Sequence, residues 1–215
     1  MIGNLFISCH SPRIPPIFPN MTEPIIPPPP DLATASLADI AKLVADKSLP
    51  PVDKWNPERC GNSEMRIARD GTWFYQGTPI GRAAMVKLFS TVLRREADRS
   101  YVLVTPVEKL DIEVEDAAFT AVEMKSEGEG TERRLAFRLN TDDMVVAGPD
   151  NPLRFEENED GPRPYIHVRG KIGNGLEALI ARPLFYEIAE MALSEGEQPL
   201  GVWSNGERFL LEQPA

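Results

Sequence analysis

The most constraining feature of the chain is a short motif that occurs twice, 100 residues apart. In both places a polar, strand-like segment and a turn lead through Ile-x-Arg into an amphipathic stretch. This repetition indicates one β-hairpin/helix unit used twice, although two unrelated strand–helix units would leave a similar trace. A groove between two copies would be a natural place for a ligand. The matched residues are Arg69, Ile80 and Arg82 in the first copy and Arg169, Ile180 and Arg182 in the second.

Length and charge bound the class of protein. A chain of 215 residues can form one large domain or two small ones. Its net charge of −10 argues against binding to a nucleic-acid backbone or to an anionic membrane. Cys9 and Cys60 form no CxxC motif, which fits a reducing compartment. Since no apolar run approaches the roughly 20 residues that span a bilayer, we expect a cytoplasmic protein.

The chain divides into three parts in this interpretation. Residues 1–30 hold nine of the 21 prolines and predict a disordered tail, with a docking segment for a proline-binding partner as the alternative. Residues 31–96 predict an N-terminal α+β domain, with a first helix that Ser36 caps. A two-residue hairpin turn at Asp70-Gly71 and an amphipathic helix over 82–95 complete it.

Residues 97–215 predict a C-terminal β domain. Short strands separated by turns favour an antiparallel meander or a partial barrel. A packing helix follows with Pro183 in its first turn, and Asn205-Gly206 predicts a terminal hairpin. The fold class is therefore α+β, with a C-terminal part of pleckstrin-homology-like architecture. The expected strands lie at 101–104, 107–115, 119–126, 132–139, 144–147, 153–156, 165–169 and 176–180.

Three segments resemble a bacterial family catalogued as domain of unknown function 1285. They run from Trp55 to Gly61, from Arg69 to Ile80 and from Val102 to Lys109, and the resemblance extends to about Leu193. It implies a duplicated core, a C-terminal half similar to pleckstrin-homology-like folds and a ligand site where the halves meet. It further implies a nucleobase-containing ligand and a role in signal transduction, but no catalytic residues.

Five residues are the candidate ligand-binding set. Arg82 and Arg182 fall at predicted helix starts, where the helix dipole disfavours cations, so each needs a carboxylate partner or an anionic ligand. The planar guanidinium suits carboxylate or phosphate, and an indole can stack on a base, although an aromatic residue in a hairpin also suits the core. The predicted groove between the two parts contains Arg69, Trp73, Arg82, Thr105 and Arg169.

Other chemistry has little support in the sequence. His10 and His167 are the only histidines, and we interpret His167 as a hydrogen-bonded surface or interface residue. Cys60 lacks an evident base, and the alternating acids from Asp111 to Glu115 suggest a solvated strand face. We therefore predict no metal, no cofactor and no catalytic group.

The leading hypothesis is a small-molecule binding protein, a sensor or adaptor for which nucleotide-like compounds are one ligand class. An enzyme acting on a small anionic metabolite is the first alternative, with Asp70, Glu108 or Asp142 as a general acid or base. A protein-interaction module that uses a sheet edge or the tail is the second. Turnover of a bound compound would distinguish the enzyme from the binding protein.

Overall fold

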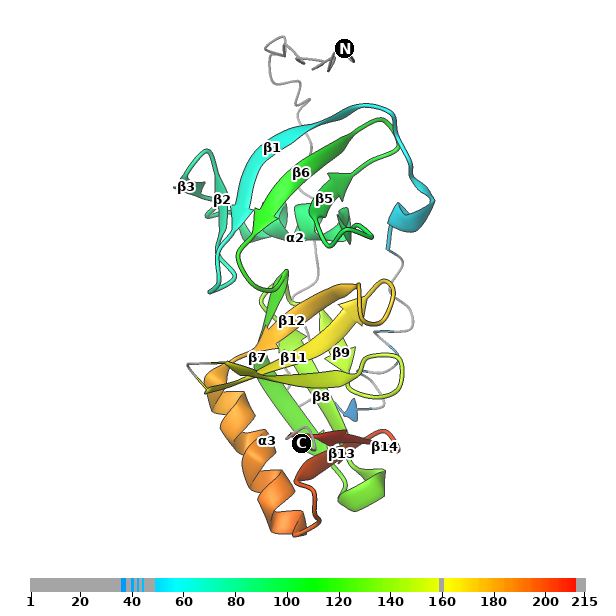
Figure 1. Cartoon of the computed structure of the whole chain (residues 1–215), viewed down its shortest axis with the longest axis vertical. Helices are drawn as coiled ribbons and strands as arrows, with labels where there is room; N and C mark the ends of the chain where they lie inside the picture. Colours follow the sequence, from blue (N-terminus) through cyan, green and yellow to red (C-terminus); the bar gives the residue numbers. More distant parts are fainter. Residues whose placement is uncertain are drawn as a thin grey trace, which may run out of the picture.

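The structure is a computed structural model that describes Ser36, Leu37, Ile40, Lys42, Val44 and residues 49–158 and 161–211. The expectation of a proline-rich tail over residues 1–30 lies outside these residues. The described chain is mixed α+β and forms two halves, each built on a six-stranded sheet (Figure 1). No helix among the described residues is long and apolar enough to cross a membrane.

The first half holds one sheet and one helix. A single 3-10 turn, η1 (Val52–Lys54), precedes the sheet, and α2 (Ala83–Thr91) interrupts it. The strand order is β3-β2-β1-β6-β5-β4, in which β1 and β6 are parallel and the other neighbours are antiparallel. The strands are β1 (Cys60–Ile67), β2 (Trp73–Tyr75), β3 (Thr78–Pro79), β4 (Leu93–Arg95), β5 (Tyr101–Val104) and β6 (Lys109–Val114).

The second half repeats this plan and adds elements at its end. Its strand order is β10-β11-β12-β7-β8-β9, with β12 and β7 parallel. The short 3-10 turn η2 (Gly130–Glu132), the helix α3 (Arg182–Glu195) and the hairpin of β13 (Gly201–Ser204) and β14 (Glu207–Leu210) surround the sheet. The strands are β7 (Phe119–Glu127), β8 (Arg134–Leu139), β9 (Met144–Val146), β10 (Leu153–Asn158), β11 (Gly161–Arg169) and β12 (Leu176–Ile180).

The two-part repeated architecture is confirmed, but its register is not the 100-residue offset. Each sheet consists of two three-stranded antiparallel meanders. The first strand of the first meander pairs in parallel with the last strand of the second meander, so β1 corresponds to β7 and β6 to β12. The segments around Arg69 and Arg169 do share a hairpin followed by a helix. However, β1 and β2 are the first two strands of the first sheet in chain order, whereas β11 and β12 are the last two strands of the second. The matched arginines therefore mark similar local units at non-equivalent places.

Three further expectations are corrected by strand pairing. The expected domain boundary at 96/97 falls between β4 and β5, which pair within one sheet, so the division lies after β6. Of the two arrangements expected for the second sheet, the single antiparallel meander is wrong, because the central pair of strands is parallel, and the partial barrel remains. Asp70-Gly71 is not a two-residue turn: Ala68 and Thr72 are bonded across a longer loop, and in that pair only Gly71 has a positive φ, of 83°.

The two-residue turns lie elsewhere, at Gln76-Gly77 and Asn205-Gly206. Both residues of each pair have positive φ, the geometry that a type I′ hairpin requires. The second pair confirms the terminal hairpin that the sequence predicts.

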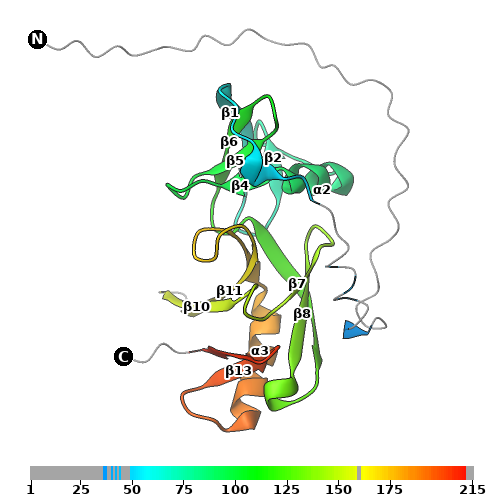
Figure 2. The same ribbon diagram turned by 90° about the vertical axis from the view of Figure 1, so that its right-hand side faces the viewer.

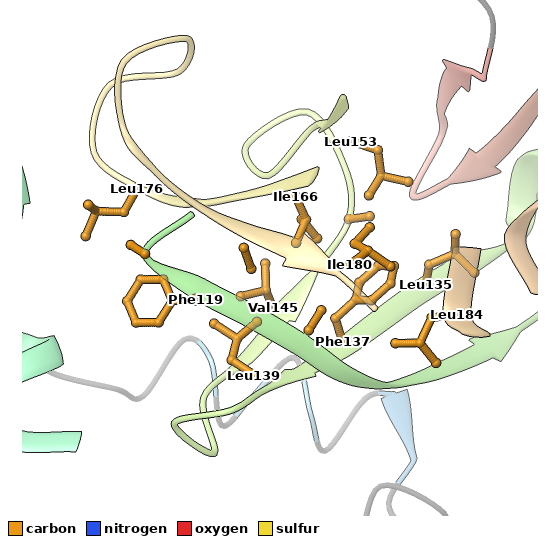
Figure 3. Packing of buried hydrophobic residues seen from close by; sticks show 14 of the residues in the cluster. Phe119, Leu135, Phe137, Leu139, Val145, Leu153, Ile166, Leu176, Ile180 and Leu184 are labelled. Carbon is orange, nitrogen blue, oxygen red and sulfur yellow. The ribbon is translucent and has the colours of Figure 1, made fainter. Parts of the chain in front are cut away.

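One hydrophobic core extends through both halves. Alternate residues of β12 point inward, and they belong to the same buried cluster as Phe119 of β7 and Phe137 and Leu139 of β8 (Figure 3). The same cluster includes Ile67, Trp73 and Leu93 of the first half. Because buried apolar contacts continue across the junction, the halves are packed on each other, and the link from β6 to β7 passes between them (Figures 1 and 2).

Candidate functional site

The polar contacts between the halves are mainly from side chains to backbone carbonyls. The Arg169 Nη2 atom donates to the carbonyls of Ser90 and Leu93, at and just beyond the C-terminal end of α2. A cation is favourable there because the helix dipole places partial negative charge at that end. In the opposite direction, Arg95 donates to the Gly175 carbonyl over 3.3 Å.

A second contact between the halves joins the side chain of Asn140 to the backbone of Gly71. The Asn140 side chain donates to the Gly71 carbonyl over 3.2 Å and accepts from the Thr120 amide over 3.1 Å. A Cβ atom on Gly71 would lie 2.7 Å from both Asn140 Nδ2 and Thr120 Oγ1. Gly71 also has φ of +83°, so this junction requires glycine for both space and conformation.

Beside these contacts lies a hollow of about 370 Å³, which we call the interface cavity. Its walls come from the segment before β1, from β4 and from the loop between β11 and β12, which lies toward the first half in both ribbon views (Figures 1 and 2). The lining residues are Leu49, Pro50, Val52, Asp53, Leu93, Arg94, Arg95, Ala97, Arg169, Gly170, Lys171, Asn174, Gly175 and Leu176.

Positive charge dominates this lining, with three arginines and one lysine against the single carboxylate of Asp53. Arg94 is committed to structure, since its Nη1 donates to the Val52 and Trp55 carbonyls, each over 2.7 Å. Burial lowers the pKa of Arg169 below its usual range.

Polar atoms without protein partners also occur in the lining. The Nε atoms of Arg95 and Arg169 and the Asn174 Oδ1 atom are buried without a hydrogen-bond partner among the described residues. Lys171 is exposed and forms no ion pair within the described chain. The cavity therefore combines unused donors with net positive charge in a protein of net charge −10.

His167 holds the loop that closes one side of the cavity. Its Nε2 atom lies 3.1 Å from the Gly170 carbonyl, and a Cβ on Gly175 would lie 2.3 Å from its Cε1. His167 is 4% exposed, so of the two expected positions, surface or interface, the surface one is wrong, whereas the expected hydrogen bond is present. Burial lowers the pKa of His167. Both faces of β11 are covered in this region, because Ile166 is buried as well.

The structure separates the five predicted ligand residues. Arg169 lines the interface cavity, whereas Arg69, Trp73, Arg82 and Thr105 do not. Trp73 is 2% exposed and its ring lies 6.5 Å from that of Phe89, centroid to centroid, so its indole belongs to the core.

The other three lie in turns or at a helix start. Arg69 is exposed in the β1–β2 loop, and Arg82 is the exposed residue at the N-cap of α2. The Thr105 hydroxyl accepts from the Glu108 amide over 3.2 Å and stabilises its own turn. Ligand binding by these residues stays a prediction that their positions do not favour.

The candidate carboxylates are also dispersed. Hydrogen bonds from Thr72 lower the pKa of Asp70, Asp142 lies 3.2 Å from Arg138, and Glu108 lies 3.8 Å from Arg59. A second hollow, of about 520 Å³, lies over β1 and β6 and contains Glu64, Asp111 and Glu113. Among the described residues no group of three or more His, Cys, Asp or Glu could hold a metal ion.

Sequence reasoning missed Arg95, Lys171 and Asn174. A signal for the last two was present in the glycine-rich run from Gly170 to Gly175, which did not match a phosphate-loop pattern. Arg95 carried no such signal, because its role depends on the docking of β4 against that loop.

Two family models match the chain, those of the domain of unknown function DUF1285: its N-terminal domain over residues 50–117 and its C-terminal domain over residues 118–211. A crystal structure of a DUF1285 family protein from Silicibacter pomeroyi DSS-3 is 46% identical, with a TM-score of 0.70 over 82% of this chain and 94% of that one. Another, from Shewanella baltica OS155, is 23% identical, with a TM-score of 0.44 over 59% of this chain and 91% of that one. No curated protein matches. The chain belongs to the DUF1285 family, and the two family domains meet between β6 and β7.

Proposed function

We propose that the protein binds a small anionic molecule in the interface cavity and acts as a sensor or adaptor. The observation that carries this proposal is the excess of cationic residues around a hollow that both halves line. The other arginines of the repeated motif, Arg69, Arg82 and Arg182, are exposed to solvent and need no buried anion.

Arg94 in the lining is paired with Glu96. Arg95, Arg169 and Lys171 form no ion pair among the described residues, so the cavity gathers three cationic groups without matching carboxylates.

The lining suggests how an anion would be held. Lys171 is a mobile point charge at the rim, suited to attracting an anion, while the guanidinium of Arg95 presents donors in a fixed plane. The volume lies near the lower end of the range usual for small-molecule sites, about 300–1,000 Å³. Leu93 and Leu176 supply apolar surface for an uncharged part of the ligand. Nucleoside monophosphates are therefore one suitable class, beside dicarboxylates and inorganic phosphate.

A pleckstrin-homology-like assignment of the C-terminal half remains part of this proposal. The feature that favours it is α3, which follows the second sheet and joins the shared core through Leu184, Ile188 and Ala192. We propose a signalling role as well, on the ground of the family resemblance, since a fold by itself specifies no function.

The test is a thermal-shift screen with nucleoside monophosphates, dicarboxylates and inorganic phosphate, followed by calorimetry on the compound that stabilises most. Lys171→Met should weaken binding about tenfold or more, since a charged hydrogen bond contributes about 1.5–3 kcal/mol. Lys87→Met is the matched control, because Lys87 lies on α2 outside the cavity lining. Binding should also weaken with added salt.

Equal affinities of the wild type and Lys171→Met would refute this location. Mass spectrometry of the bound compound after prolonged incubation addresses the enzyme alternative. Unchanged compound supports a binding protein, and a new product would replace that conclusion with catalysis.

A further inference from the structure

One hydrogen-bond acceptor in the interface cavity lacks a donor. The Asn174 Nδ2 atom donates to the Glu96 carbonyl over 2.9 Å, and this bond between the halves sets the orientation of the side-chain amide. The Asn174 Oδ1 atom is buried and has no hydrogen-bond partner among the described residues. Because a buried acceptor without a partner is destabilising, a donor inside the cavity would supply the missing bond.

The cavity also contains a carboxylate that is not used by the protein. Asp53 supplies the one carboxylate among the described lining residues, and its side chain is exposed. It forms no ion pair within the part of the chain that the structure describes. Burial lowers the pKa of Arg169, and the negative charges of Asp143 and Asp53 act in the opposite sense. Asp53 therefore lies near enough to influence this guanidinium without bonding to it.

Asp53 is held in place although it is exposed. It belongs to η1, whose first residue, Val52, is buried against β5. Arg94 donates to the carbonyls of Val52 and Trp55, each over 2.7 Å. These contacts keep the carboxylate in the wall of the cavity, where it can bind a cationic group.

The charges of the lining define which ligand satisfies all of it. Three unpaired cationic groups, those of Arg95, Arg169 and Lys171, face one unpaired carboxylate. A simple dianion would neutralise the cations, but it would be repelled by Asp53 and would offer no donor to Asn174. A ligand that matches both kinds of group carries more negative than positive charge and also carries an N–H donor.

We propose that the ligand of the interface cavity is a small amino dicarboxylate, whose ammonium group donates to Asp53 and to Asn174 Oδ1. Its two carboxylates bind the unpaired cations Arg95, Arg169 and Lys171. This inference rests on the proposed function and narrows its anion to one chemical class. The hollow of about 370 Å³ accommodates a molecule of this size, and Leu93 and Leu176 lie beside its methylene groups.

Calorimetry with matched compounds tests the role of the ammonium group. L-aspartate and succinate share their carbon skeleton and both carboxylates and differ in the amino group, and L-glutamate and glutarate form a second matched pair. The wild type should bind the better amino compound about tenfold more tightly than its matched dicarboxylate, the scale of one charged hydrogen bond.

Asp53→Asn tests the assigned partner of the ammonium group. It should weaken binding of the amino compound about fivefold, because a charged hydrogen bond is replaced by a neutral one. Binding of the matched dicarboxylate should stay equal or become tighter, since a repulsive charge is removed. Asp111→Asn is the matched control, because Asp111 is an exposed aspartate of the acidic hollow over β1 and β6, and it should alter neither affinity.

Asn174→Ala should also reduce the preference for the amino compound. The ratio of the two affinities is the informative readout, because a smaller folded fraction lowers both affinities equally. A preference that persists in both Asp53→Asn and Asn174→Ala, or that disappears in Asp111→Asn, would overturn the assigned position of the ammonium group.

The wild type separates failure of this inference from failure of the proposed function. Equal affinities for an amino compound and its matched dicarboxylate would overturn the amino dicarboxylate and leave the anion site standing. Binding of inorganic phosphate or a nucleoside monophosphate without binding of either matched pair would do the same. If no anion in the screen binds, the ligand class and the proposed function are both refuted.

Discussion

Replacement of Gly71 by alanine tests whether the halves meet as closely as the structure places them. The new methyl group would lie 2.7 Å from Asn140 Nδ2 and from Thr120 Oγ1. To relieve this steric overlap, Asn140 must move. Its side chain bridges the halves, because it donates to the Gly71 carbonyl and accepts from the Thr120 amide. Gly77→Ala is the matched control, because Gly77 has a φ of +76° and nothing lies within 4 Å of its added Cβ.

The expected magnitudes separate conformation from crowding. A left-handed backbone costs an alanine about 1–2 kcal/mol, and this applies to both variants. Overpacking adds about 1–3 kcal/mol at Gly71 alone, and disturbance of the Asn140 bonds adds about 0.5–1.5 kcal/mol. Gly71→Ala should therefore lower the free energy of unfolding by about 2.5–6.5 kcal/mol, and Gly77→Ala by about 1–2 kcal/mol.

Urea unfolding followed by circular dichroism measures both values, and thermal melts give an independent check. At this chain length each kcal/mol corresponds to about 2–4 °C in the melting temperature. In a double-mutant cycle, Asn140→Ala should remove part of the additional cost at Gly71. Equal losses for Gly71→Ala and Gly77→Ala would show that Gly71 does not contact the second half.

Two further predictions concern the cavity walls. Arg169→Leu should lower the free energy of unfolding by about 1–3 kcal/mol, because its charged hydrogen bonds to the Ser90 and Leu93 carbonyls are lost while the cost of burying the cation is relieved. Arg69→Leu at an exposed site should change it by less than about 0.5 kcal/mol, and equal urea midpoints for the two variants would contradict this. Burial lowers the pKa of His167, so its contribution to stability is present above the unfolded pKa of about 6.5 and is lost as pH falls below that value. His167→Gln should therefore flatten the pH dependence between about pH 7 and pH 5, and melts that keep the wild-type slope would assign that slope to other groups.

Local patterns predicted the elements better than their arrangement. The alternation in β12, the Asn205-Gly206 turn and the helix after Ala181 follow from nearest-neighbour chemistry, and all three are present. The parallel pairing of β1 with β6 joins residues about 50 positions apart, which no local pattern indicates. For the same reason, the boundary was placed before β5 instead of after β6.

The candidate site shows the same limit. Arg169 was identified because it repeats a motif, yet its partners Ser90 and Leu93 reach it only through packing of the halves. Trp73 was ambiguous in the sequence, since an indole serves equally well for stacking on a ligand and for filling a core. Lys171 lacked any periodic context, and its importance comes from the cavity at whose rim it lies.

The most direct test of the central claim is an amide chemical-shift titration of ¹⁵N-labelled protein with the anion that stabilises it most in the thermal screen. We expect the largest shifts in β4 and in residues 170–176, which line the cavity from opposite halves. Both groups should titrate with one dissociation constant. Shifts confined to one half, or centred on the acidic hollow around Asp111 and Glu113, would contradict an anion site between the halves.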